Sequence, residues 1–277
     1  MKVEELLKKD FVCLDGSMGA VVMGMGYSPD NILRLNLEAP GVISGIQRGY
    51  FEAGSDMVFT NTFDLKKQTA ERYGVELGDL VSAAVKNAYD ACEGLEEKFV
   101  ALDLSPTGLE EDEAYDHYAL MIDTAKDSTD LIVVETLTSL SDLRACIRAA
   151  KACSSLPLFS SISLRENGRT WYGDALEDYI DIVNASDILC AGINCTLDPA
   201  GMLPLALKLR ENCDKAVYAK PNRGQPVKTQ SGTSYDMSAE EFSDGIAELY
   251  RRGIRVLGGC CGSDAECIRM INKKIRG

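Results

Sequence analysis

The sequence of 277 residues lacks any stretch that approaches the roughly 20 consecutive apolar residues needed to span a bilayer. It also lacks the apolar segment of a signal peptide, because its first ten residues alternate charge and leucine. Basic residues are the minority, 29 against 43 acidic ones, which gives a net charge of −14. A field of this sign repels phosphate backbones and anionic membrane surfaces. We therefore predict a cytoplasmic protein and expect no nucleic acid and no membrane as a partner.

No Ser-, Pro- or Gly-rich linker divides the chain, and its 45% hydrophobic and 26% charged residues are ordinary globular values. Short apolar runs, typical of strands buried on both faces of a parallel sheet, alternate with segments of helical periodicity. The expected strands are residues 11–15, 56–60, 99–103, 131–135, 158–162, 189–193, 216–220 and 254–258. Eight such units predict an α/β fold, a TIM (β/α)8 barrel forming one domain over residues 1–277. A doubly wound open sheet is the rival.

Several local features refine this prediction. Residues 140–150 carry apolar side chains at helical spacing, and Ser238 with Glu241 forms the pattern of a capping box. We expect a short helix over residues 3–9 to cover the bottom of the barrel. The acidic segment 108–116 is expected to be a surface loop, and the single histidine, His117, a surface residue without a catalytic role.

Polar residues and three cysteines follow the ends of the expected strands. Because the active site of a TIM barrel lies at the carboxyl ends of its strands, these residues are candidates for the site. They are Asp15–Gly19, Thr60–Phe63, Glu135–Thr136, Asn194–Thr196, Lys220–Gly224 and Gly258–Gly262.

The cysteines at this rim favour metal chemistry. In a reducing compartment ten cysteines do not form a disulfide framework, so a cluster is better explained by metal binding or catalysis. Cys260 and Cys261 can face one point if the flanking glycines let the backbone leave the strand. With Cys195 they would give three soft ligands and one open position, which suits a catalytic zinc site. A vicinal redox pair, or a core position for Cys195, stays open.

Five motifs occur along the rim in a recognisable order: Asp15–Gly19, Thr60–Phe63, Gly192–Cys195, Pro221–Pro226 and Gly258–Gly262. Together they resemble the homocysteine S-methyltransferase family, and they cover nearly the whole chain. The double-glycine, double-cysteine motif is very specific when an Asn-Cys pair precedes it. Within the family, the chain is most similar to the homocysteine-binding module of cobalamin-dependent methionine synthases.

The resemblance implies a zinc-loaded barrel that methylates the sulfur of homocysteine to give methionine. It implies these site residues: the Zn²⁺ ligands Cys195, Cys260 and Cys261, and the substrate contacts Asp15, Glu135 and Asn194. We predict no catalytic residue beyond the zinc site. The chemistry is consistent, because a thiol with a pKa of ~8.5 is mostly protonated at neutral pH, whereas coordination to zinc deprotonates it. Asp15 and Glu135 would pair with the substrate ammonium; from the residues alone, a helix-capping role explains them equally well.

The resemblance suggests methylcobalamin on a partner corrinoid protein as the methyl donor. Relatives that use S-methylmethionine, S-adenosylmethionine or betaine have the same zinc motifs, so these donors stay open. Two further alternatives are a different thiol acceptor on the same barrel and a non-catalytic subunit that binds zinc or homocysteine.

Some residues depart from the family pattern. Ser161-Ile162-Ser163 stands in place of Ser-Gly-Thr, Leu104-Ser105-Pro106 in place of a Gly-Pro, Gln47 in place of histidine, and Arg223 in place of a small residue. These changes leave the cysteines intact but alter the expected amino-acid pocket, so they leave the identity of the acceptor thiol open.

Overall fold

The apolar runs of the sequence form a parallel sheet in the computed structural model, which describes residues 1–229 and 232–277. Its eight strands follow the order β1-β10-β7-β6-β5-β4-β3-β2. The strands are β1 (Val12–Cys13), β2 (Met57–Phe59), β3 (Phe99–Leu104), β4 (Leu131–Leu137), β5 (Leu158–Ile162), β6 (Cys190–Asn194), β7 (Ala216–Lys220) and β10 (Val256–Leu257). Each predicted strand is present within a few residues of its predicted bounds, and the TIM-barrel prediction is confirmed.

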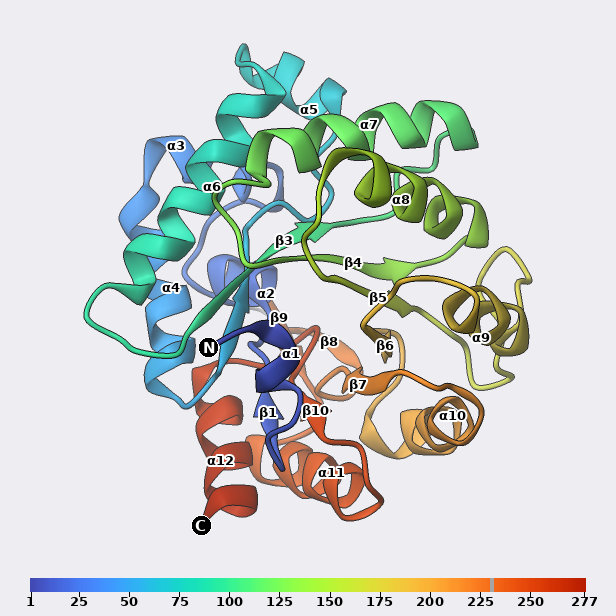
Figure 1. The fold of residues 1–277 in the computed structure, drawn as a ribbon. Coiled ribbons are helices and arrows are strands. Elements are labelled where there is room, and N and C mark those ends of the chain that lie inside the picture. Colours follow the sequence, from blue (N-terminus) through green and yellow to red (C-terminus); the bar gives the residue numbers. More distant parts are fainter. Residues whose placement is uncertain (230–231) are drawn as a thin grey trace.

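Helices surround the sheet and pack on its outer face (Figure 1). The helices are α1 (Val3–Leu6), α2 (Met18–Gly24), α3 (Leu35–Glu38), α4 (Pro40–Glu52), α5 (Lys67–Tyr73), α6 (Leu77–Cys92), α7 (Glu111–Ala125), α8 (Leu140–Cys153), α9 (Leu176–Asn184), α10 (Pro199–Asn212), α11 (Ala239–Arg251) and α12 (Ala265–Arg276), with a 3₁₀ turn at Pro29–Asn31. The predicted capping box at Ser238 and Glu241 begins α11. Over the described residues, no helix is long and apolar enough to cross a membrane.

The two outermost strands of the sheet, β1 and β2, meet through a narrow seam. The backbone N–H of Asp56 donates to the carbonyl of Cys13 at 2.7 Å. Two carboxylates bridge the same seam from opposite sides: Asp56 Oδ2 accepts from the Cys13 N–H at 2.8 Å, and Asp15 Oδ2 accepts from the Phe59 N–H at 2.7 Å. Because hydrogen bonds to charged groups are stronger than neutral ones, these carboxylates stabilise the closure of the barrel.

The amino ends of the strands are closed by α1, as predicted, although this helix ends at Leu6 and not at Lys9. Val3 and Leu6 are buried against an inward-facing apolar cluster that includes Met57, Phe99 and Phe159. In Figure 1, α1 lies in front of the strands, near the middle of the ring of helices. This end of the barrel is therefore packed with apolar side chains.

Two expectations about the segment after β3 are wrong. The acidic segment 108–116 is not all loop, because α7 begins at Glu111. Its acidic residues form the first turn of the helix, where negative charge interacts favourably with the helix dipole. His117 is partly buried in α7 rather than on the surface, and burial lowers its pKa.

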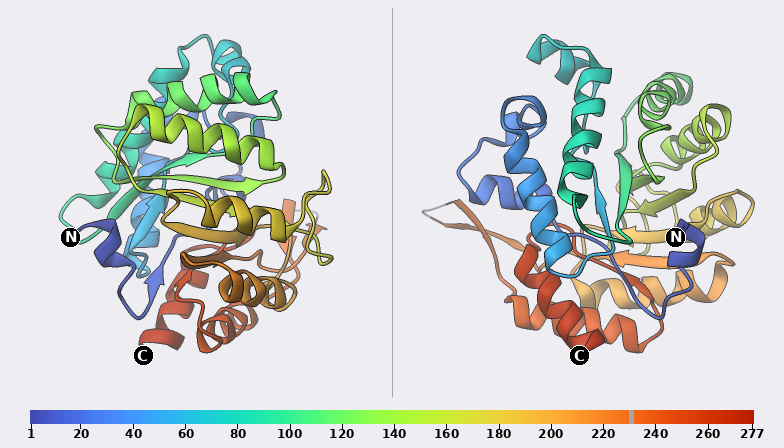
Figure 2. Two further views of the ribbon diagram at one scale, coloured as in Figure 1. Left: turned by 45° about the vertical axis from the view of Figure 1, so that its right-hand side comes forward. Right: turned by 60° about the vertical axis from the view of Figure 1, so that its left-hand side comes forward.

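The hairpin that follows β7 was not predicted from the sequence. Strands β8 (Pro226–Thr229) and β9 (Gly232–Tyr235) pair antiparallel and project from the barrel at the end opposite α1 (Figure 2). The hairpin returns the chain to the rim, where Tyr235 lies against the turn that carries Cys260 and Cys261.

Candidate active site and metal centre

The three predicted cysteines lie together at the carboxyl end of the barrel. Cys195 follows β6, whereas Cys260 and Cys261 follow β10, and their sulfur atoms all lie within 4.8 Å of one another. The Sγ atoms of Cys195 and Cys261 are 3.8 Å apart. Two sulfurs bound to one tetrahedral zinc at ~2.3 Å would be about 3.8 Å apart, whereas a disulfide would need ~2.05 Å. The spacing therefore fits a shared metal ion.

Local backbone geometry turns these thiols toward one point. Cys195 and Thr196 both have φ of 60°, which takes the chain sharply away from the β6 direction. Gly262 follows the cysteine pair with φ of 84°, and a Cβ there would lie 2.5 Å from the Tyr235 ring. This position therefore requires glycine for both its conformation and its contact with the hairpin.

The end of β7 holds both cysteine segments in place. The Cys195 N–H donates to the Lys220 carbonyl at 3.0 Å, and the Cys260 N–H donates to the Pro221 carbonyl at 2.8 Å. Asn222 Oδ1 accepts from the Cys261 N–H at 3.1 Å. The ligand positions are thus fixed by backbone hydrogen bonds, which favours preorganised metal binding.

The thiols alter the pKa of one another. Hydrogen bonds from Cys260 and Cys261 lower the pKa of the Cys195 thiol to about 3. The contact with Cys195 raises the pKa of Cys260 and of Cys261, which also interact with each other and are further desolvated. The cluster by itself therefore favours one negative charge among the three thiols. A bound cation would allow all three thiols to ionise.

A cavity of about 780 Å³ opens beside the cysteines. Its lining includes Asp15, Asp103, Glu135 and Lys220, all nine-tenths or more buried. The cavity thus places titratable groups next to the thiols, as expected for a site that recognises a polar substrate.

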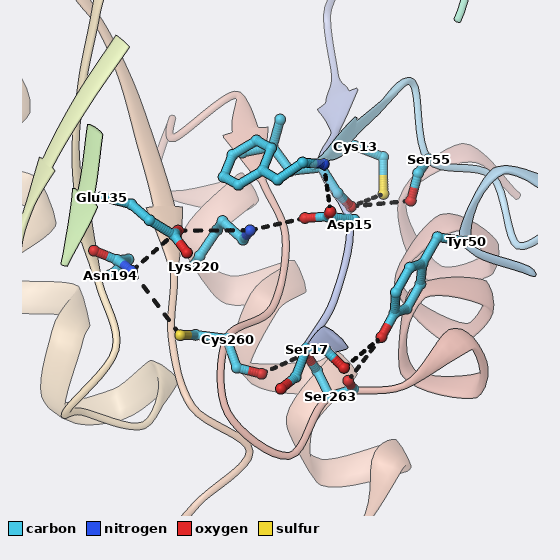
Figure 3. Close-up of polar contacts among 12 residues, drawn as sticks. Cys13, Asp15, Ser17, Tyr50, Ser55, Glu135, Asn194, Lys220, Cys260 and Ser263 are labelled. Atoms are coloured by element: carbon cyan, nitrogen blue, oxygen red, sulfur yellow. Dashed lines mark hydrogen bonds and ion pairs between the residues drawn. The ribbon is translucent and has the colours of Figure 1, made fainter. Parts of the chain in front are cut away.

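Lys220 joins the two carboxylates that the sequence predicted as substrate contacts (Figure 3). Its Nζ lies 2.8 Å from Asp15 Oδ1 and 3.8 Å from Glu135 Oε2. It also lies 3.7 Å from the centre of the Phe59 ring, a cation–π contact. Burial alone would lower the pKa of Lys220, but the charges of Asp15 and Glu135 outweigh it and raise the pKa. Lys220 is therefore a buried ammonium held by the protein itself.

Sequence reasoning placed Lys220 on the rim but gave it no role. The signal was present, since a lysine ends the buried run Ala216–Lys220. Charged residues at the end of a buried strand are rarely left without a partner. The partners lie 205 and 85 positions away in the sequence, so pattern alone did not reveal them.

Asn194 is fully buried and lies between Glu135 and Cys260 (Figure 3). Its Nδ2 donates to Glu135 Oε2 at 3.2 Å and to Thr136 Oγ1 at 2.7 Å. Its Oδ1 accepts from the Thr136 N–H at 2.7 Å and from Ser161 Oγ at 2.8 Å. These bonds favour a positioning role, in which Asn194 fixes Glu135 beside the cysteines.

The residues that depart from the family pattern contact the residues and backbone that surround the thiols and carboxylates. Ser161 holds Asn194, and the Ser163 hydroxyl contacts the Thr196 hydroxyl at 2.6 Å. Gln47 Nε2 donates to the Phe59 carbonyl at 2.9 Å, behind the ring that covers Lys220. Arg223 contacts the Met237 and Gly262 carbonyls and so braces the cysteine turn against the hairpin. The departures therefore act on the framework around the thiols and carboxylates.

Comparison with known proteins agrees with this geometry. A sequence model of homocysteine S-methyltransferases matches residues 12–275. Methionine synthases from Mycobacterium tuberculosis and Mycobacterium leprae are each 24% identical to the chain over 96% of its length. The chain spans about a quarter of these relatives, 25% and 24% of their lengths.

Among solved structures, the metallated form of the homocysteine methyltransferase MmuM from Escherichia coli matches with a TM-score of 0.85. The match covers 99% of both chains at 19% identity, and at this identity it shows the shared fold. The family match extends over nearly the whole chain and includes the cysteines, the carboxylates and Lys220. The chain belongs to the homocysteine S-methyltransferase family, a family of methyltransferase enzymes.

Proposed function

We propose that the chain is a zinc-dependent methyltransferase that activates a thiol, with homocysteine as the acceptor that its family predicts. The observation that supports this most directly is the trio of Cys195, Cys260 and Cys261, spaced as ligands of one tetrahedral ion beside a cavity. Three sulfur ligands match the preference of zinc for soft donors and leave one coordination position for a substrate. When bound, zinc would act as a Lewis acid that ionises the acceptor thiol near neutral pH.

The residues of the chain would prepare the transfer in two ways. The hydrogen bonds at Cys195, Cys260 and Cys261 fix the sulfur ligands, and the cavity admits the acceptor next to them. In the transfer, the acceptor sulfur donates an electron pair to the methyl carbon and the S–C bond forms. The bond between methyl and donor breaks, its electron pair stays with the donor, and the thiol proton passes to solvent.

A methylcorrinoid carried by a partner protein is the donor we propose. Two matched relatives are methionine synthases, and this chain corresponds to about a quarter of their length. The donor must reach the acceptor from the open end of the barrel, because α1 and the apolar cluster fill the opposite end.

Zinc analysis and methyl transfer test this proposal. The purified protein, reconstituted under reducing conditions, should hold about one zinc per chain and transfer methyl from free methylcobalamin to a thiol. Thiol binding should add one sulfur at ~2.3 Å to the zinc shell in X-ray absorption and release a proton in calorimetry. A protein that holds no zinc after reconstitution, or whose zinc shell responds to no thiol, would contradict the proposal. Zinc and thiol binding without turnover would instead favour a non-catalytic binding subunit.

A different thiol acceptor is the second candidate, and one observation favours it. The two carboxylates predicted to hold the ammonium of homocysteine, Asp15 and Glu135, already contact the ammonium of Lys220.

A further inference from the structure

We infer that Lys220 fills the place of a substrate ammonium, so that this site selects an acceptor thiol without a free amino group. The inference rests on the zinc-dependent thiol methylation of the proposed function and develops its second candidate acceptor. The substrate class it names is thiols that resemble homocysteine with hydrogen in place of the α-amino group. This selection depends on Lys220, its two carboxylate partners and Asp103, a further buried residue that lines the cavity.

The surroundings of Lys220 form a complete recognition site for an ammonium group. Two carboxylates and an aromatic face meet at its Nζ, and its side chain is 4% exposed. These are the groups that would bind the ammonium of an amino-acid ligand. Here the chain supplies that ammonium from β7 (Figure 3).

The carboxylates are also engaged by neutral donors. Asp15 Oδ2 accepts from the Phe59 N–H at 2.7 Å, and Glu135 Oε2 accepts from Asn194 at 3.2 Å. A second ammonium would therefore add a positive charge next to Lys220, at carboxylates that already accept from Lys220, Phe59 and Asn194. Like charges in a buried site oppose binding more strongly than they do in water.

Displacement of Lys220 by a substrate is also unfavourable. Its Nζ would have to leave a site where the three charged side chains are 4%, 7% and 10% exposed. Removing one partner from a buried ion pair leaves the other charges uncompensated. Lys220 therefore stays in place when the acceptor binds.

Asp103 is a further buried carboxyl that lines the cavity. Within residues 1–229 and 232–277, its buried Oδ1 has no hydrogen-bond partner. Burial and the neighbouring Glu135 raise its pKa, although Lys220 opposes the shift. In its uncharged form Asp103 offers a hydrogen-bond donor, which suits a carboxylate or carbonyl of the acceptor better than an ammonium.

The decisive measurement compares two thiols on the zinc-loaded wild-type protein by calorimetry. One is homocysteine and the other is its deaminated analogue, so the pair differs only in the amino group. We expect the analogue to bind at least about tenfold more tightly, the size of one charged interaction. Equal affinity, or a preference for homocysteine, would overturn the inference and leave the proposed function intact.

Variants then test the role of Lys220. Lys220→Met should shift the preference toward homocysteine by at least about tenfold, because Asp15 and Glu135 become available to its ammonium. Lys151→Met, which removes an exposed lysine on α8, should leave the preference unchanged. Zinc content and circular dichroism should be the same in both variants. If Lys220→Met folds and binds zinc without changing the preference, the inference is wrong.

Asp103→Asn tests whether Asp103 donates a hydrogen bond to the acceptor as an uncharged group or binds an ammonium as a carboxylate. If Asp103 acts as an uncharged donor, the amide should preserve the preference for the deaminated thiol. A selective loss of homocysteine binding would instead show that Asp103 holds an ammonium, and the inference would fail. If neither thiol binds to the wild-type protein or alters its zinc shell, the proposed function fails as well. The X-ray absorption spectrum of the zinc distinguishes this outcome from a failure of the inference alone.

Discussion

The two ends of the barrel use the same strands for opposite purposes. At the amino ends, inward-facing apolar side chains pack under α1, whereas at the carboxyl ends Asp15, Glu135 and Lys220 meet the three cysteines. Strand β6 makes the contrast within five residues. Cys190 begins the strand fully buried, and burial raises the pKa of its thiol well above the ordinary value. Cys195 directly follows it, and its thiol pKa is lowered by two sulfur neighbours. The environment of each cysteine, rather than the residue type, decides whether it packs or reacts.

The largest effect should come from Cys195, with Cys190 of β6 as its control. Cys195→Ala should weaken zinc binding by more than about 100-fold and abolish methyl transfer. Loss of a residue that only hydrogen-bonds to a metal ligand already lowers metal affinity by about 10–100-fold. Cys190→Ala should keep zinc binding unchanged, because its thiol lies in the apolar cluster of the other end. Zinc competition with a chelator measures both affinities. Similar losses in the two variants would contradict the separation of the two ends.

The apolar end should control stability without controlling the metal. Phe159 is fully buried in the cluster under α1, with its ring centre 6.2 Å from that of Tyr218. We expect Phe159→Ala to lower the free energy of unfolding by about 3–5 kcal/mol, because it leaves a cavity in a packed interior. Zinc affinity of the folded protein should not change.

Trp171→Ala is the matched control for this loss of an aromatic ring. Trp171 is 64% exposed, so its removal should alter the free energy of unfolding by no more than about 0.5 kcal/mol. Urea unfolding provides both values. A small effect for Phe159→Ala would show that the cluster is less tightly packed than its burial indicates.

Two aspartates at the seam between β1 and β2, Asp56 and Asp15, allow the two ends of the barrel to be compared by the same substitution. Asp56→Asn and Asp15→Asn each weaken a charged contact across the seam, and we expect each to cost about 1.5–3 kcal/mol in unfolding free energy. Asp56 also pairs with Arg276, on the outside of the barrel, whereas Asp15 pairs with Lys220 in the cavity. Only Asp15→Asn should therefore change thiol binding as well, which calorimetry would detect. A change of thiol binding in Asp56→Asn would argue against this division.

Much of this organisation could be predicted from the sequence. Buried parallel strands have continuous apolar runs, so the number of strands and their order along the chain could be predicted. The glycines around Cys260 and Cys261 indicated a turn that brings the thiols together. The interactions of Lys220 could not be predicted, because they depend on how side chains from distant strands meet inside the barrel. For the same reason the contacts of Arg223 differ from expectation: the side chain braces the cysteine turn rather than reshaping the amino-acid pocket. The local sequence pattern of apolar and polar residues predicts which side chains each strand buries. It does not predict which charged side chains of different strands lie next to each other.

Asp103 should give the smallest effect, with a dependence on pH that identifies its cause. Burial raises the pKa of Asp103 above that of an aspartate in the unfolded chain, so the folded protein binds this proton more tightly. Its contribution to stability is therefore fully present below the unfolded pKa of ~3.9 and is lost as pH rises through the folded pKa. Asp103→Asn removes the ionisable group and should raise the free energy of unfolding near pH 7 by about 1 kcal/mol, because the folded wild-type protein must there either bury a charge or take up a proton.

The advantage of Asp103→Asn should shrink as pH falls toward 4 and below it, because the wild-type carboxyl then becomes protonated in the unfolded chain as well as in the folded protein. Urea unfolding of wild type and variant over this range measures the difference. A difference that does not change with pH would mean that the pKa of Asp103 is not raised in the folded protein, and that the open end of the barrel retains a carboxylate able to bind an ammonium.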